Sequence, residues 1–192
     1  MGSTGIRFAG FGGQGVILAG MIIGRAATIY DGGNATLIQS FGPEARGGAC
    51  SAQLIISTEP ILCPYQEQDD VLVTLSQGAY TRFRGSLNPA GTLILEENLV
   101  KPHPNRHYGE VFAIPATQIA EQMGCKLILN VIMVGFATAV VGIVTPDAVR
   151  KAVRDSVPPS TEVLNLEAFE KGWNFGLERI RSSRPLPASV LR

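Results

Sequence analysis

The chain has 192 residues, of which 45% are apolar and 17% charged, and its 16 basic and 16 acidic residues give a formal net charge of zero. This length suits one α/β domain with a hydrophobic core of its own. The sequence has no basic block and no stripe of basic and aromatic residues, which argues against a nucleic-acid partner. The low charge density indicates either a surface partly covered by other chains or a large core.

The sequence carries no membrane or secretion signal. No apolar run reaches the ~18 uninterrupted residues that a membrane helix needs, so no membrane insertion is expected. The N-terminus lacks a charged region followed by an apolar region, which predicts a cytoplasmic protein. The three cysteines, Cys50, Cys63 and Cys125, are too few and too widely spaced for a disulfide framework or an iron–sulfur cluster. We expect reduced thiols, with any electron carrier located elsewhere.

The first 40 residues predict a strand, a glycine turn, a helix and a second strand. Ile6–Ala9 is a short apolar strand, and the helix that starts at Val16 is ended by Gly32 and Gly33. The second strand, NATLIQS, covers residues 34–40. This order is typical of the βαβ unit of a parallel sheet.

The remaining elements continue the alternation of strands and helices. Strands are expected at about 51–57, 70–76, 91–98 and 110–115, with a turn at Asn88–Gly91. Helices are expected at 78–87, 116–124, 127–144, 147–157 and 160–181, and the fourth of these begins with the capping sequence Thr145-Pro146-Asp147. We predict one domain over residues 5–180, followed by a tail at 181–192 that contains proline and serine and is held only if a partner binds it.

The glycine turn is the first candidate site. It has the spacing G-x-G-x-x-G between a strand and a helix, and its candidate residues are Gly10, Gly12, Gly13, Gln14 and Gly15. Such a turn lets a phosphate approach the backbone N–H groups at a helix N-terminus. The second strand ends without the acid that would bind a ribose, and the nearest acid, Asp31, precedes that strand. An anion site or a purely structural turn is therefore favoured over a nicotinamide site.

Two further candidates follow strands at the same edge of the predicted sheet, where open α/β sheets bind ligands. The second loop comprises Gly42, Pro43, Glu44, Arg46, Gly47 and Gly48. Arg46 could bind a phosphate or carboxylate with its planar guanidinium, or pair with Glu44 on the surface. Ser76 and Gln77 could contact a ligand or cap the next helix. His103 and His107 are separated by one helical turn, but Pro104 argues against a helix there and so against a metal site.

The stretches IRFAGFGGQGVILAG (6–20) and FGPEARGGACSAQLIIS (41–57) resemble the γ component of 2-oxoacid:ferredoxin oxidoreductases. The resemblance continues through DVLVTLSQGAY (70–80), LNVIMVGFATAVVGIVTPDAVRKAV (129–153) and LNLEAFEKGW (164–173), so it spans about residues 5–176. The chain departs from the family at Phe41, where a tyrosine is common.

This resemblance implies a Rossmann-like, mostly parallel sheet with helices on both faces and no redox centre on this chain. The holoenzyme would carry thiamine diphosphate, Mg²⁺ and 4Fe–4S clusters on α and β subunits, and in some cases a δ or ferredoxin-like subunit. It would convert a 2-oxoacid and coenzyme A to acyl-CoA and CO₂, with electrons passed to ferredoxin or onward to an NAD-reducing subunit. The two glycine loops and the Ser76-Gln77 pair would then face coenzyme A or substrate, with Arg46 orienting one of them. The alternative is a stand-alone nucleotide-binding or scaffold protein.

Overall fold

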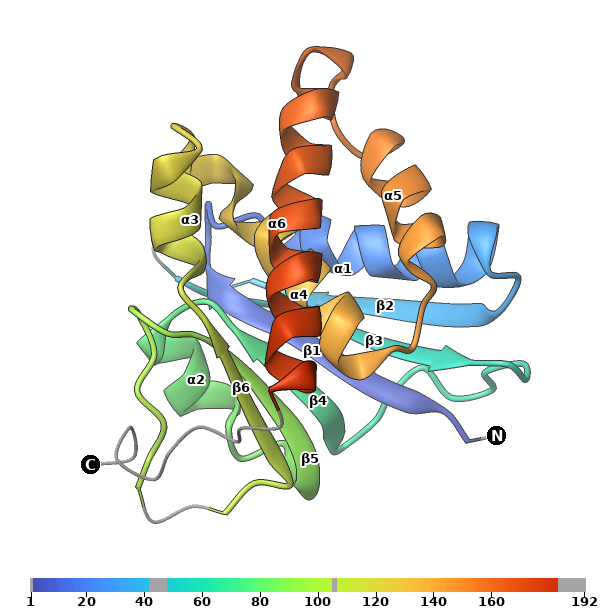
Figure 1. The fold of residues 1–192 in the computed structure, drawn as a ribbon. Helices are drawn as coiled ribbons and strands as arrows, with labels where there is room; N and C mark the ends of the chain where they lie inside the picture. The colour runs from blue at the N-terminus through green and yellow to red at the C-terminus, as the bar shows by residue number, and fades with distance from the viewer. Residues whose placement is uncertain (1, 42–47, 105–106, 183–192) are drawn as a thin grey trace.

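A computed structural model describes residues 2–41, 48–104 and 107–182 of the chain, in which helices cover both faces of a six-stranded sheet (Figure 1). The strands are β1 (Thr4–Phe11), β2 (Asn34–Ser40), β3 (Ala49–Ser57), β4 (Asp69–Thr74), β5 (Leu87–Glu96) and β6 (Glu110–Ile114). The α-helices are α1 (Val16–Arg25), α2 (Gln77–Phe83), α3 (Ala116–Gln122), α4 (Leu129–Val141), α5 (Pro146–Arg154) and α6 (Glu162–Arg181). A π-helical turn, η1 (Ala26–Tyr30), extends α1, and short 3₁₀ turns, η2 (Lys126–Ile128) and η3 (Pro159–Thr161), precede α4 and α6.

The strand order is β2-β3-β1-β4-β5-β6, and the pairs from β1 to β6 are parallel. The predicted single α/β domain with a mostly parallel sheet is therefore confirmed. The predicted βαβ unit is wrong in one respect, because β3 lies between β1 and β2 and is antiparallel to both. The physical reason is the short connection at residues 41–48, since a parallel crossover needs about ten residues or more.

The two faces of the sheet are covered unequally. On one face, α1, α3, α4, α5 and α6 pack on alternate strand residues such as Phe8, Leu54 and Val73, which are buried in the larger core cluster. On the other face α2 packs over Leu72 and Leu93 in a smaller cluster. Within the described residues, no helix is both long and apolar enough to cross a membrane.

Most helix boundaries agree with the capping signals in the sequence. Thr145 is the N-cap of α5, and its side chain accepts a hydrogen bond from the Ala148 N–H. Gly32 and Gly124 have the positive φ values, 70° and 75°, that favour glycine after a helix. The turn predicted at Asn88–Gly91 is wrong, because these residues lie inside β5, where the pairing with β4 shifts register.

Helices α4 and α6 cross with their backbones in direct contact. A Cβ added at Gly135 would lie closer than 3.0 Å to the Phe169 carbonyl oxygen, and one added at Gly172 would meet the Ile132 carbonyl oxygen in the same way. The helix predicted at 127–144 corresponds to α4, and eleven of its residues, from Leu129 to Ala139, are buried. The glycines explain how α6 can cover this helix so closely.

Candidate functional site

The glycine turn lies at the carboxyl edge of β1, next to the ends of its neighbours. The Gly12 N–H donates to the Gly48 carbonyl at 3.0 Å, so the turn touches the segment that leads into β3. The Leu75 N–H donates to the Ala9 carbonyl at 2.8 Å, which brings the end of β4 to the same place. The predicted meeting of the glycine turn, Gly48 and Ser76 at one edge of the sheet is thus observed.

Gln14 braces the turn from inside. Its side-chain oxygen accepts from the Phe11 N–H at 2.7 Å, and its amide nitrogen donates to the Leu75 carbonyl at 3.0 Å. A Cβ at Gly10 would lie 2.6 Å from the Gln14 oxygen, so Gly10 makes room for this brace. Both polar ends of Gln14 are bonded to main chain, so this side chain shapes the turn.

Asn130 braces the turn from the other side. This residue is 2% exposed at the start of α4, and its amide nitrogen donates to the Gly15 carbonyl at 3.1 Å. Gly13 and Gly15 have φ values of 100° and 69°, and a side chain on Gly15 would collide with Asn130. In the sequence, Asn130 is a lone amide in an otherwise apolar stretch, and that isolated amide is the signal for its role.

The turn presents a helix N-terminus. α1 begins at Val16 and has no side-chain cap at Gly15, and the first N–H groups of any α-helix have no partner within the helix. Together with the helix dipole, these groups favour an anion beside Gly13 and Gly15. The geometry is therefore compatible with a phosphate or carboxylate at the turn.

The second loop falls mostly outside the described residues. Of its candidate residues, only Gly48 is described, and it is buried beside Gly12. Five other candidates lie outside the described residues: Gly42, Pro43, Glu44, Arg46 and Gly47. Phe41, just before them, is 64% exposed, and Phe11 at the end of β1 is 37% exposed.

Ser76 and Gln77 have structural partners. Ser76 is the N-cap of α2, with its hydroxyl accepting from the Ala79 N–H at 3.3 Å. The Gln77 side chain bonds to both main-chain groups of Lys101, accepting from the N–H at 2.7 Å and donating to the carbonyl at 3.3 Å. Of the two alternatives that the sequence left open for this pair, the structure supplies the capping one for Ser76.

Asp31 is engaged far from the turn. It precedes β2, at the opposite end of this strand from the second loop, and its carboxylate accepts from Thr145 at both oxygens, at 2.7 and 2.6 Å. An acid that binds a ribose would stand at the carboxyl end of the second strand. The position of Asp31 agrees with the sequence argument against a nicotinamide site.

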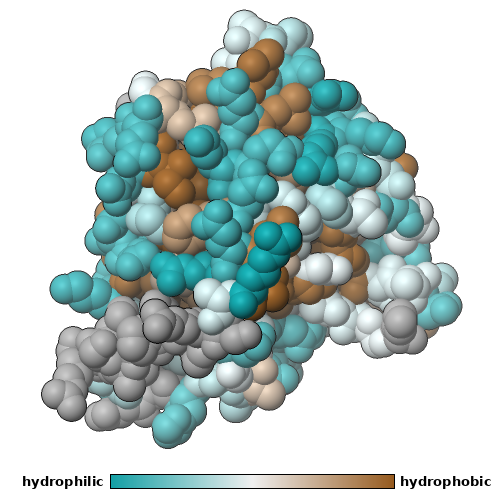
Figure 2. Space-filling view, in the orientation of Figure 1, coloured by the Kyte–Doolittle hydropathy of each residue, from teal (hydrophilic) through white to brown (hydrophobic). Residues whose placement is uncertain are grey.

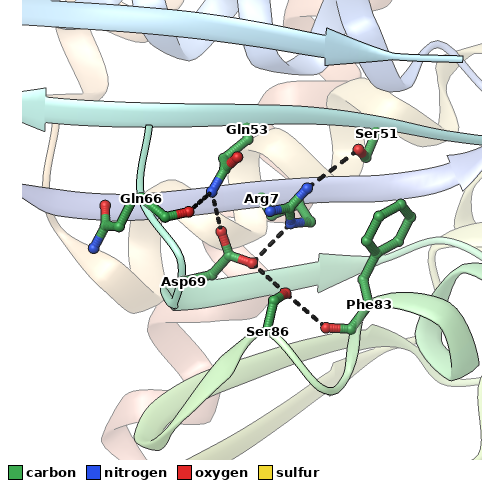
Figure 3. A network of polar contacts seen from close by, with 7 residues as sticks. All are labelled: Arg7, Ser51, Gln53, Gln66, Asp69, Phe83 and Ser86. Atoms are coloured by element: carbon green, nitrogen blue, oxygen red, sulfur yellow. Dashed lines mark hydrogen bonds and ion pairs between the residues drawn. The ribbon is translucent and has the colours of Figure 1, made fainter. Parts of the chain in front are cut away.

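A buried polar network fixes the other end of the sheet (Figure 3). Asp69 is fully buried; its Oδ2 pairs with the Arg7 guanidinium at 2.7 Å and lies 2.5 Å from the Ser86 hydroxyl. The Gln53 amide donates to Asp69 Oδ1 at 3.0 Å and to the Gln66 carbonyl at 2.9 Å. The carboxylate is thus paired and hydrogen-bonded on both oxygens, as a buried charge requires.

The cysteines are free thiols, as expected. Cys50 is buried in β3, and burial raises the pKa of its thiol, so it stays protonated at neutral pH. Cys63 is exposed. The described residues contain no group of three or more His, Cys, Asp or Glu side chains placed to hold a metal ion.

Comparison with known proteins assigns the chain to a family. The family described as "Pyruvate ferredoxin/flavodoxin oxidoreductase" matches residues 5–175. The chain belongs to this family. The match includes both glycine loops and the α4–α6 pair, and it confirms the resemblance seen in the sequence.

The chain is similar to γ subunits over about nine tenths of its length. It is 43% identical to the 2-oxoglutarate synthase subunit KorC of Methanocaldococcus jannaschii, over 90% of this chain and 94% of that protein. It is 33% identical to the pyruvate synthase subunit PorC of the same organism, over 91% of this chain and 97% of that protein. The crystal structure of the γ subunit of a keto/oxoacid ferredoxin oxidoreductase from Geobacter sulfurreducens is 37% identical, with a TM-score of 0.84, and covers 93% of this chain and 98% of that one. The chain is thus a γ-type subunit of the 2-oxoacid:ferredoxin oxidoreductases.

Some relatives carry the same fold within a longer chain. The ketoisovalerate oxidoreductase subunit VorA of Methanothermobacter marburgensis is 29% identical over 91% of this chain, which is 37% of VorA. A 2-oxoglutarate:ferredoxin oxidoreductase from Magnetococcus marinus shares the fold with a TM-score of 0.80 at 23% identity, over 97% of this chain and 32% of that chain. In these relatives the γ-type domain is joined to a larger remainder.

Proposed function

We propose that this γ subunit works in a complex that oxidises 2-oxoglutarate. In that reaction 2-oxoglutarate and coenzyme A yield succinyl-CoA and CO₂, and the two electrons released pass to ferredoxin. The observation that supports this substrate is the 43% identity to KorC over nearly both full lengths, against 33% to PorC. A cytoplasmic complex of this γ subunit with α and β subunits, and a δ or ferredoxin-like subunit, is part of the proposal.

We propose that this chain supplies an anion-binding surface, formed by the glycine turn, and does not carry the reacting cofactors. Thiamine diphosphate, when bound with Mg²⁺ on the partner subunits, supplies the chemistry that cleaves the carbon–carbon bond, and 4Fe–4S clusters there carry electrons. The described residues of this chain offer no donor set that fits either a metal or a cluster. They do offer the N-terminus of α1, whose first N–H groups, beside Gly13 and Gly15, suit a phosphate of coenzyme A or a substrate carboxylate.

The rigidity of this anion-binding surface is what the chain contributes to catalysis. Gln14 and Asn130 hold the turn from two sides, so its N–H groups are oriented before a ligand arrives. Preorganised donors cost little ordering free energy at the moment of binding. Arg46, in the second loop, would add a guanidinium that pairs with the same anion.

The test is a native pull-down of the tagged chain, with the eluate assayed for viologen reduction that depends on coenzyme A and a 2-oxoacid. We expect iron-containing partners and a kcat/KM for 2-oxoglutarate at least about tenfold above that for pyruvate, as differential binding of the side-chain carboxylate would give. A complex that prefers pyruvate or a branched 2-oxoacid would overturn the substrate. A chain that is isolated alone, without activity, would instead favour the stand-alone binding protein.

Arg46→Ala tests the second loop in the assembled complex. Losing a charge-assisted hydrogen bond to an anion should raise the KM for coenzyme A or for 2-oxoglutarate by about 10–100-fold, and Arg46→Lys should recover part of the loss. Arg154→Ala is the control, because this arginine on α5 pairs with Glu162 at an exposed site. Unchanged kinetics for both substrates in Arg46→Ala would remove Arg46 from the proposed site.

A further inference from the structure

The connection between β3 and β4, residues 58–68, displays large apolar side chains in water. It has no helix or strand, and its sequence includes PILCPY at residues 60–65. Leu62 is 96% exposed and Tyr65 is 75% exposed, so both stand almost free of the domain. On the helical face, by contrast, hydrophobic side chains form separate patches among hydrophilic ones (Figure 2), which is ordinary for a protein surface.

Contacts at Gln66 anchor the C-terminal end of the segment to the domain. At its end, the Gln66 carbonyl accepts from the buried Gln53 side chain, which also binds Asp69 (Figure 3). The Gln66 side chain lies over Gly5, where a Cβ would collide with it, and the Gly5 N–H donates to Asp70 at 2.8 Å. Pro60 and Pro64 further restrict the backbone that precedes these anchors. Leu62 and Tyr65 therefore extend from a backbone that is anchored to the domain at Gln66.

The charged residues within 58–70 all have one sign. Residues 58–70 contain four acids, namely Glu59, Glu67, Asp69 and Asp70, and no basic residue. Asp69 pairs with Arg7, and Asp70 accepts from the Gly5 N–H, whereas Glu59 and Glu67 are exposed. A complementary surface would offer an apolar hollow for Leu62 and Tyr65 with basic side chains at its rim.

The segment lies away from the glycine turn. β3 ends beside the start of β1, with Ile56 opposite Thr4, whereas the turn follows the end of β1 (Figure 1). A partner bound at residues 58–68 would therefore leave the carboxyl edge of the sheet open to substrate.

We propose that residues 58–68 form a docking segment for another subunit of the complex. In the longer relatives the γ-type domain is joined to a further region within one chain, and the proposed subunit carries the counterpart of that region as a separate chain. This inference rests on the proposed function. This chain covers only 37% of VorA and 32% of the Magnetococcus marinus chain, so the domain works there joined to a large partner region. A γ subunit made as a separate chain must form this association through its surface. The occupant is that subunit, through an apolar hollow bordered by Lys and Arg.

Cys63 provides a native reporter, because it stands between Leu62 and Tyr65 and is exposed. The assembled complex is treated with a maleimide for timed intervals, and labelling of each cysteine is read by peptide mass spectrometry against the same complex in denaturant. We expect Cys63 to react at least about tenfold more slowly in the complex than in the denatured chain, because thiol reactivity follows exposure. A Cys63 that reacts as fast in the complex as in the denatured chain would overturn the proposal.

The double variant Leu62→Ser, Tyr65→Ser tests the contact energetically. Both side chains are exposed, so the circular dichroism of the chain should not change. The protein concentration at which the complex dissociates on dilution, followed by mass photometry, should rise by about 100-fold. Val163→Ser, at a 70% exposed position on α6, is the matched control and should dissociate like the wild type. If the wild type forms no complex, the proposed function fails; if the wild type and the double variant form equally stable complexes, only the docking segment is wrong.

Discussion

At the scale of single residues, Gly15 and Asn130 form one of the contacts that shape the glycine turn. Gly15→Ala should lower the free energy of unfolding by about 2 kcal/mol or more, because φ is 69° there and the new Cβ would collide with the Asn130 amide. Urea unfolding of the purified chain measures this. A loss below about 0.5 kcal/mol would show that Asn130 moves aside freely.

The same pair can be separated by a double-mutant cycle. Asn130→Ala removes one of the two donors to the Gly15 carbonyl, which still accepts from the Ala19 N–H, at a cost of about 1 kcal/mol, but it also removes the obstacle to a side chain at position 15. The cost of Gly15→Ala should therefore be smaller in the Asn130→Ala background by about 1 kcal/mol. Strictly additive costs would mean that the strain at Gly15 is only in its backbone.

How far the sequence predicted this site depends on the kind of residue. The spacing of Gly10, Gly12 and Gly15 predicted the turn, because glycine is required where a backbone folds this tightly. It could not predict that both polar ends of Gln14 bond to main chain, since one of these bonds reaches Leu75, which is distant in sequence. The partner of Asn130 was hidden for the same reason.

At the scale of elements, the contact between α4 and α6 depends on glycine in both helices. Gly172→Ala would place a Cβ against the Ile132 carbonyl and the Phe136 nitrogen, which are backbone atoms that cannot turn away. We expect a loss of about 3 kcal/mol in unfolding free energy, despite the better helix propensity of alanine. Denaturant unfolding checks the value.

Gly24→Ala in α1 is the matched control for this helix pair. The nearest atom to its new Cβ is the Leu54 Cδ2, at an ordinary 3.4 Å, so the propensity gain of about 0.8–1 kcal/mol should be expressed. If both variants lose stability equally, close packing at Gly172 is not what distinguishes them. Element boundaries were predictable where a local signal exists, as at Thr145. They failed at Asn88–Gly91, where a turn-like sequence forms an irregularity inside β5, between Leu87 and Thr92, which pair with β4.

At the scale of the whole molecule, strand order was the part that the sequence did not supply. β2 and β3 both have the composition of strands, but composition does not say which strand lies beside β1. Ser51 and Gln53 alternate along β3 as surface residues would, yet both are buried, because Arg7 and Asp69 give them partners on that face. The polar network and the inserted strand are thus one feature, which only the assembled sheet shows.

The extent of the domain gives a test at the same scale. The last buried residue of α6 is Gly176, and the helix ends at Arg181, so we propose that residues beyond 182 add nothing to the core. A chain cut after Ser182 should keep its Tm within about 2 °C, which corresponds to less than about 1 kcal/mol for a domain of this size. A chain cut after Thr161 loses all of α6, including the buried Phe169, and should not fold, because α4 would then expose the face that α6 covers. A clear fall in the Tm of the chain cut after Ser182 would show that part of the tail contributes to the folded domain.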